Sequence, residues 1–154
     1  MGIETWAGPT RRAAVSNRAA GELFRDFGVT ACTDITGFGF AGHLLEMLDG
    51  SNVSASIDAK SIPLYEGFAE VTAGGIVSSL HRDNAKVAAR VAATSRLPGW
   101  LFDPQTSGGL LGAVRPEMVE STLGRLREVG CAAAASIGEV VAAGTEIGPM
   151  IVLP

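Results

Sequence analysis

Cysteine is scarce in this chain, and the little that is present has no metal-binding arrangement. Only Cys32 and Cys131 occur among 154 residues, far apart and in apolar surroundings, with no CxxC pair and no Cys/His cluster. Such a pattern gives no indication of a zinc site. We expect both side chains to be buried thiols in a reducing compartment.

The sequence also lacks the signals of membrane and nucleic-acid proteins. No apolar run approaches the roughly 20 residues of a membrane span. The first ten residues have neither the basic nor the apolar region of a signal peptide, and Trp6 stands where myristoylation requires Ser or Thr. The net charge is −4, and the only adjacent basic pair is Arg11 and Arg12. We therefore predict a cytoplasmic protein whose partners include no nucleic acid and no membrane.

The composition that is present is typical of a folded α/β domain. Hydrophobic residues make up 47% and charged residues 18%, which argues against disorder. Twenty glycines and many alanines suit tight turns and close packing of helices on a sheet. The length fits a single domain over residues 1–154, with a loose terminus at residues 1–10.

Hydrophobic periodicity predicts helices and strands in alternation. Helices are expected at 9–27, 40–48, 63–73, from a cap at Asp83, and at 116–129, with Gly28, Asp49-Gly50 and Gly130 as stops. Strands are expected at 29–33, 53–57, 109–114, 132–141 and in the tail up to Pro154. The predicted fold is an α/β sandwich, with a mixed sheet of four to six strands packed against helices.

The first motif is the segment Cys32–Gly39, in which a carboxylate precedes a glycine-rich turn. A strand ends, glycines let the backbone turn, and the N–H groups of a following helix favour an anion. Asp34 would then stand where Mg²⁺ can lie between a carboxylate and a phosphate. The alternative is that Asp34 or Thr36 only caps the helix. The segment has no GKS or GKT and so is not a P-loop.

The second motif is the segment Asp103–Gly109, the densest polar patch in the chain. Gln105, Thr106 and Ser107 supply donors and acceptors, and the two glycines permit close approach of another backbone. This loop either contacts a phosphate and lines an active site, or is a turn that leads into a buried strand.

Together the two motifs resemble a known family. The stretches CTDITGFGFAGHLLEML and LFDPQTSGGLL are similar to two signature stretches of selenophosphate synthetases (selenide, water dikinases) of the AIR synthase-related superfamily. The pieces SNRAAGELFRDFGVTACTD and GGIVSSLHRDNAKVAARV agree as well, so the resemblance covers roughly residues 16–141. It implies a domain like the AIR synthase C-terminal domain.

The resemblance also implies an activity and a set of site residues. The family makes selenophosphate, AMP and orthophosphate from selenide, ATP and water, with Mg²⁺. ATP is held mainly by an amino-terminal domain, which would be the partner of this one, and a homodimer stays open. Asp34 is the implied metal-site residue. Thr33, Thr36, Gly37, Thr106 and Ser107 would lie beside the metal and the phosphates of ATP. No catalytic residue is assigned to this chain, and activity of the chain alone is not expected.

Several other readings stay open at this point. The chain could instead be a stand-alone, non-catalytic module that binds a partner or an anion. His43 could approach the phosphates, although we favour a packed helix histidine, and His81 with Arg82 could bind an anion or form a capping turn. Trp100 is expected to brace the second motif. An exposed apolar patch is expected where an amino-terminal domain packs.

Overall fold

The computed structural model describes residues 16–93, 95–143 and 149–153. The predicted helix start at Pro9 and the loose terminus at 1–10 lie outside these residues. The helices are α2 (Arg18–Asp26), α3 (Gly39–Ser51), α4 (Phe68–Ala73), α5 (His81–Asn84) and α6 (Val119–Glu128). The strands are β1 (Cys32–Asp34), β2 (Val53–Asp58), β3 (Val91–Ala93), β4 (Leu110–Gly112), β5 (Gly138–Ala142) and β6 (Met150–Leu153). Short 3₁₀ helices occur at Ala59–Ser61 (η1), Ala85–Arg90 (η2), Gly99–Phe102 (η3) and Pro116–Met118 (η4).

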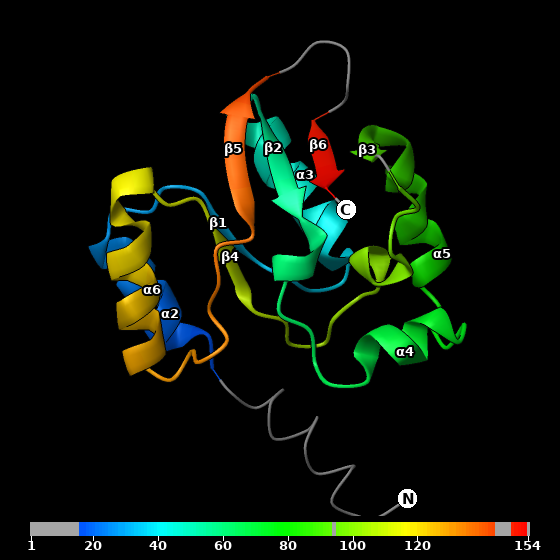
Figure 1. Ribbon diagram of the computed structural model, residues 1–154, viewed down its shortest axis with the longest axis horizontal. Helices are drawn as coiled ribbons and strands as arrows, with labels where there is room; N and C mark the ends of the chain where they lie inside the picture. The colour runs from blue at the N-terminus through cyan, green and yellow to red at the C-terminus, as the bar shows by residue number, and fades with distance from the viewer. Residues whose placement is uncertain (1–15, 94, 144–148, 154) are drawn as a thin grey trace, which may run out of the picture.

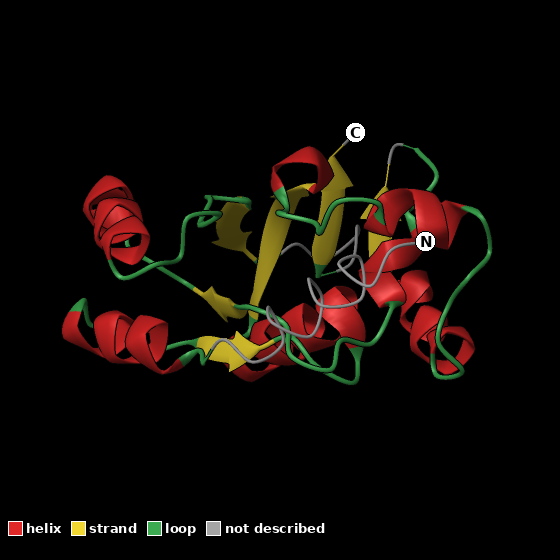
Figure 2. Ribbon diagram, turned by 90° about the horizontal axis from the view of Figure 1, so that it is seen from below, coloured by secondary structure: helices red, strands yellow, loops and turns green. Residues whose placement is uncertain are grey.

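The main sheet has four strands in the order β3-β6-β2-β5. Strand β2 pairs antiparallel with β5 and parallel with β6, and β6 pairs parallel with β3, so the sheet is mixed. Helix α3 lies against one face of this sheet (Figures 1 and 2). A separate ribbon of β1 and β4 leads from the sheet towards α2 and α6 at one end of the molecule (Figure 1). The predicted mixed α/β fold is confirmed.

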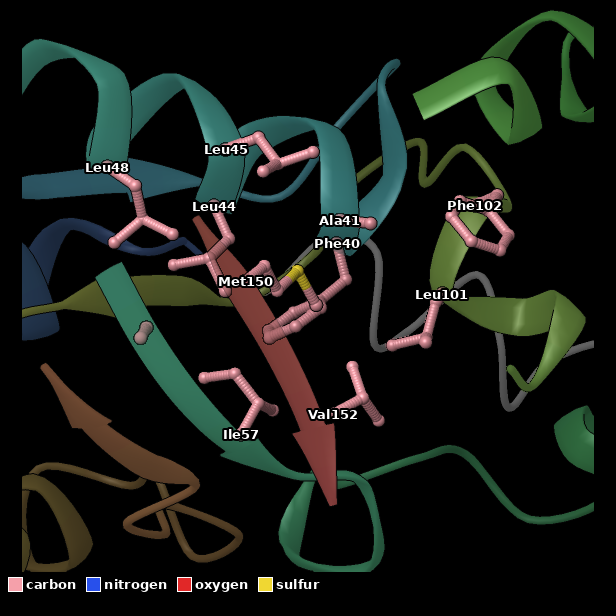
Figure 3. Packing of buried hydrophobic residues seen from close by; sticks show 11 residues of the cluster. Phe40, Ala41, Leu44, Leu45, Leu48, Ile57, Leu101, Phe102, Met150 and Val152 are labelled. Atoms are coloured by element: carbon pink, nitrogen blue, oxygen red, sulfur yellow. The ribbon is translucent and has the colours of Figure 1, made fainter. Parts of the chain in front are cut away.

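The main core lies between α3 and the sheet. Helix α3 is apolar around most of its circumference, and Leu44 points towards Met150 of β6 (Figure 3). Leu45 and Leu48 belong to the same buried cluster. Leu101 of η3 is also fully buried in this cluster. Burying a leucine side chain contributes about 1.5–3 kcal/mol. This core fixes the position of α3, and the first motif leads directly into that helix.

A smaller core joins α2 to α6. Leu23 and Phe24 of α2 pack with Leu126 of α6. Both helices end at a glycine with positive φ, Gly28 at 68° and Gly130 at 99°. After α2, the Val29 N–H donates to the Phe24 carbonyl and the Gly28 N–H to the Arg25 carbonyl, which is the Schellman pattern. Cys131 and Gly130 repeat it after α6. The predicted stops at Gly28 and Gly130 are confirmed.

Two predicted strands and one helix end were wrong in their bounds. The strand expected at 29–33 begins only at Cys32, because the Val29 N–H is already bonded to the end of α2. The strand expected at 132–141 begins only at Gly138, where pairing with Ile57 begins. Helix α3 continues past Asp49-Gly50 to Ser51. It ends at Asn52, which adopts the left-handed conformation that asparagine tolerates.

Two predicted helix starts were also wrong. The helix expected from Pro63 begins at Phe68, after Gly67 with φ 78°. Asp83 does not cap a helix: it lies inside the short α5, and the chain continues as the 3₁₀ helix η2. Helix 116–129 and strands 53–57 and 109–114 are confirmed to within a few residues. In the described parts of the chain, no helix is both long and apolar enough to cross a membrane.

Candidate functional site

The two motifs, about 70 residues apart in the sequence, are joined in the fold. Strands β1 and β4 pair antiparallel, with Asp34 opposite Leu110. The contact continues past the strands: the Ile35 N–H donates to the Gly109 carbonyl at 3.0 Å, and the Gln105 N–H donates to the Thr36 carbonyl at 2.9 Å. The first and second motifs therefore form one surface.

Glycines make this close approach possible. A Cβ atom on Gly108 would lie 2.2 Å from the carbonyl oxygen of Ile35. A Cβ atom on Gly39 would lie 2.8 Å from the carbonyl carbon of Phe102, and Gly39 also has φ 70°. Any side chain at either position would separate the two backbones.

Asp34 lies at the end of β1 with its side chain exposed. Within the described residues, its carboxylate makes no hydrogen bond or ion pair and does not cap a helix. Side chains alternate along a strand, so Thr33 lies on the face opposite Asp34. The Thr33 hydroxyl donates to the backbone carbonyl of Asp34 at 3.2 Å. The Asp34 carboxylate is therefore exposed and accessible to a ligand.

Thr36 is turned towards His43 in α3. The Thr36 Oγ1 atom lies 3.1 Å from His43 Nε2, and the Phe38 N–H donates to the same nitrogen at 3.4 Å. His43 is 8% exposed, and its Nδ1 lies 3.4 Å from Glu46 Oε2. Because Nε2 accepts, the ring proton belongs on Nδ1, facing Glu46. His43 therefore braces the turn from inside, as the packed-histidine reading expected, and Gly37 is exposed at its tip.

In the second motif, Asp103 is the buried polar side chain. Its Oδ1 accepts from the Ser78 N–H at 3.2 Å and lies 3.7 Å from His81 Nδ1. His81 packs edge-on against Phe102, so it lies against this motif and not in an anion site. Thr106 is exposed and Ser107 half-buried, both on the loop that faces the first motif.

Asn84 was missed by sequence reasoning. Its amide donates to the carbonyls of Gly37 and Phe102, at 2.9 and 3.0 Å, and so links the first motif to the residue just before the second motif. Asn17 similarly donates to the Gly108 carbonyl at 2.9 Å. Single asparagines at helix ends give no periodic signal, and only the tertiary contact identifies them.

Trp100, which was expected to brace the second motif, lies outside the site. Trp100 packs against the main core just before the second motif. It also lines a groove of about 480 Å³ that includes Lys60 and Arg96. That groove contains no residue of either motif, so it is not the candidate site.

The donor atoms at the site suit a metal ion that phosphates or another domain also bind, and not a metal ion that this domain holds by itself. Among the described residues, no group of three or more His, Cys, Asp or Glu side chains could hold a metal. One carboxylate suits Mg²⁺, which commonly takes one or two carboxylates together with phosphate oxygens and water. Asp34 therefore fits as a single ligand.

Cys32 lies on the same strand face as Asp34, and the prediction that it is buried was wrong. Its side chain is exposed, because three-residue strand β1 is covered poorly on that face, and Cys131 is only half-buried. Partial removal of water, and then the negative charge of Asp34, raise the pKa of the Cys32 thiol.

We expect Asp34→Asn to make Cys32 react faster with a disulfide reagent at a fixed, mildly alkaline pH. A negative neighbour disfavours the thiolate, so removing it lowers the thiol pKa and increases the thiolate fraction. The measurement is the rate of thiol release monitored by absorbance, with Cys131 as the internal control. An unchanged rate at Cys32 would show that the carboxylate does not act on the thiol.

Comparisons with known proteins show which family this chain resembles. The family model described as "AIR synthase related protein, C-terminal domain" matches residues 9–149. Two relatives, both named "Selenide, water dikinase", come from Pelobacter propionicus (strain DSM 2379 / NBRC 103807 / OttBd1) and Nitratidesulfovibrio vulgaris (strain DP4). The first is 41% identical over 136 residues, covering 85% of this chain and 39% of the relative. The second is 38% identical over 122 residues, covering 76% and 35%. These names confirm the resemblance to selenophosphate synthetases, and the chain spans little more than a third of the relatives' length.

A solved structure shares the fold. The crystal structure of "Hydrogenase Maturation Protein HypE" has a TM-score of 0.60 with 21% sequence identity, covering 92% of this chain and 39% of that one. The same protein "in complex with ATP" matches equally well. The fold, the joined motifs and the family model agree, and the chain therefore belongs to the family of AIR synthase related proteins and corresponds to their C-terminal domain.

Proposed function

We propose that this chain is the C-terminal domain of an ATP-dependent selenide, water dikinase, which makes selenophosphate, AMP and orthophosphate from selenide, ATP and water. The observation that supports this most directly is the pairing of β1 with β4, which places Asp34 opposite Leu110, at the strand that directly follows the loop of Thr106 and Ser107. Relatives with this name are 36–43% identical to the chain. A neighbour in fold has been solved with ATP.

The residues of this chain would position phosphates and their charge. Asp34 would be a ligand of Mg²⁺, which when bound would neutralise phosphate charge. The exposed backbone of Gly37 allows close approach of a phosphate to the start of α3. Thr106 and Ser107 would donate hydrogen bonds from the opposite loop. The Thr36 hydroxyl would hold His43, and so the turn, instead of the ligand.

An amino-terminal ATP-binding domain would complete the site. Exposed apolar side chains gather on the segment that precedes and enters α5, and Ser78 of this segment bonds to the second motif. They are Val71, Ile76, Val77 and Leu80, and Phe38 of the first motif is also exposed. Large exposed apolar side chains beside a site are typical of a docking surface. We propose that the amino-terminal domain docks on this surface. We also propose that the whole protein works in the cytoplasm and can form a homodimer.

The test is ³¹P NMR of Mg-ATP with selenide under reducing conditions. One sample holds this chain alone, a second holds the chain with a separately made amino-terminal domain of a relative, and a third holds that domain alone. Selenophosphate in the second sample only is the expected result. Product from this chain alone would contradict the need for a partner domain. No product in any sample, with both pieces folded and associated, would favour a non-catalytic binding module.

A further inference from the structure

The Asn84 side chain contacts the first motif and the residue just before the second motif. Its Nδ2 atom donates one hydrogen to the Gly37 carbonyl at 2.9 Å and the other to the Phe102 carbonyl at 3.0 Å. Gly37 is the tip of the first motif, and Phe102 directly precedes the second. The three residues are 47 and 18 positions apart along the chain, so the contact is purely tertiary.

The two carbonyl oxygens share this donor. Both point at one nitrogen, and two carbonyl dipoles brought together without a donor repel each other. The two segments also approach closely at Gly39, where a Cβ atom would lie 2.8 Å from the carbonyl carbon of Phe102. An amide group supplies two hydrogens in the required fork, which a carboxylate of the same shape cannot do.

The short helix that carries Asn84 is itself fixed to the second motif. Just before this helix, the Ser78 N–H donates to Asp103 Oδ1 at 3.2 Å. At the start of the helix, the His81 ring packs edge-on against Phe102. Asn84 is half-buried, and its neighbour Arg82 is exposed. The turn 78–84 therefore has one fixed end and one end that reaches across to the first motif.

We infer that Asn84 is a positioning residue of the site: it sets the distance between the turn that follows Asp34 and the loop of Thr106 and Ser107. It acts through Gly37 and Phe102 and touches neither metal nor phosphate. This inference rests on the proposed function, because the distance between the two motifs matters only if Mg²⁺ and phosphates bind between them.

Asn84→Asp is the informative variant, with Arg82→Ala as the control on the same turn. In this chain alone, the ¹³C resonances of the Gly37 and Phe102 carbonyls should move together in Asn84→Asp and stay in place in Arg82→Ala. In the reconstituted enzyme, Asn84→Asp should raise the Mg²⁺ concentration for half-maximal rate by about 10-fold or more, as for residues that orient metal ligands. Asn84→Ser keeps one hydrogen-bond donor, so its carbonyl shifts and its Mg²⁺ dependence should lie between those of the wild type and those of Asn84→Asp.

Two results would overturn the inference. One is a folded Asn84→Asp chain whose carbonyl shifts are confined to α5. The other is an unchanged Mg²⁺ dependence with a rate loss that only matches the fraction unfolded, measured by circular dichroism. If the wild-type mixture makes no selenophosphate, the proposed function fails, and the carbonyl resonances alone then decide whether Asn84 holds the two motifs.

Discussion

Replacing Asp34 with Asn should lower the rate of selenophosphate formation by about 100-fold or more in the reconstituted enzyme, since it removes the carboxylate that we propose as the Mg²⁺ ligand of this domain. The protein should still fold. The Asp34 side chain is exposed and makes no hydrogen bond or ion pair within the described residues, so stability should change by about 0.5 kcal/mol or less. The measurements are the ³¹P product signal over time and the thermal midpoint of the variant.

A second measurement shows whether Mg²⁺ acts at Asp34 itself. Adding Mg²⁺ with a nonhydrolysable ATP analogue to the reconstituted enzyme should speed the reaction of Cys32 with a disulfide reagent. A cation at Asp34 offsets the charge that raises the thiol pKa. Asp34→Asn should abolish this response and leave Cys131 unaffected. Full activity in Asp34→Asn, or an identical Mg²⁺ response in both proteins, would remove Asp34 from the metal site.

Gly108→Ala should destabilise the fold by about 1–3 kcal/mol or more, through overpacking. The new Cβ would lie 2.2 Å from the Ile35 carbonyl oxygen and 3.0 Å from the Ile35 Cβ. That oxygen cannot move away cheaply, because it accepts the Gly108 N–H at 3.1 Å. The strain therefore acts on the junction of the two motifs, and activity should fall together with stability. Urea unfolding monitored by circular dichroism measures the change.

The adjacent glycine provides a matched control. Gly109 is exposed, does not have positive φ, and has no atom within 4 Å of a built Cβ. Gly109→Ala should be neutral or stabilising by about 0.4–1 kcal/mol, because alanine reduces the entropy of the unfolded chain. Equal urea midpoints for the two variants would show that the backbones at Gly108 and Ile35 are not in close contact.

The sequence by itself determined the local features whose causes are local. Gly28 and Gly130 end helices because glycine accepts positive φ, and the alternation in 53–57 produced β2 because its period of two matches a strand. The residues of the two motifs were sufficient to identify the motifs and the family. The sequence could not place Cys32, because the exposure of its side chain depends on what covers β1.

Only the tertiary structure decided how these parts combine. The contacts that build the site join residues far apart in the sequence. They are the pairing of Asp34 with Leu110, the approach of Gly108 to Ile35 and the two hydrogen bonds of Asn84. The partners are separated by 18 positions (Asn84 and Phe102) to 76 positions (Asp34 and Leu110). Such contacts leave no periodic trace in a sequence. They depend on where α3, the sheet and the α2–α6 pair bury their apolar faces, and the site forms where those packed elements bring two polar loops together.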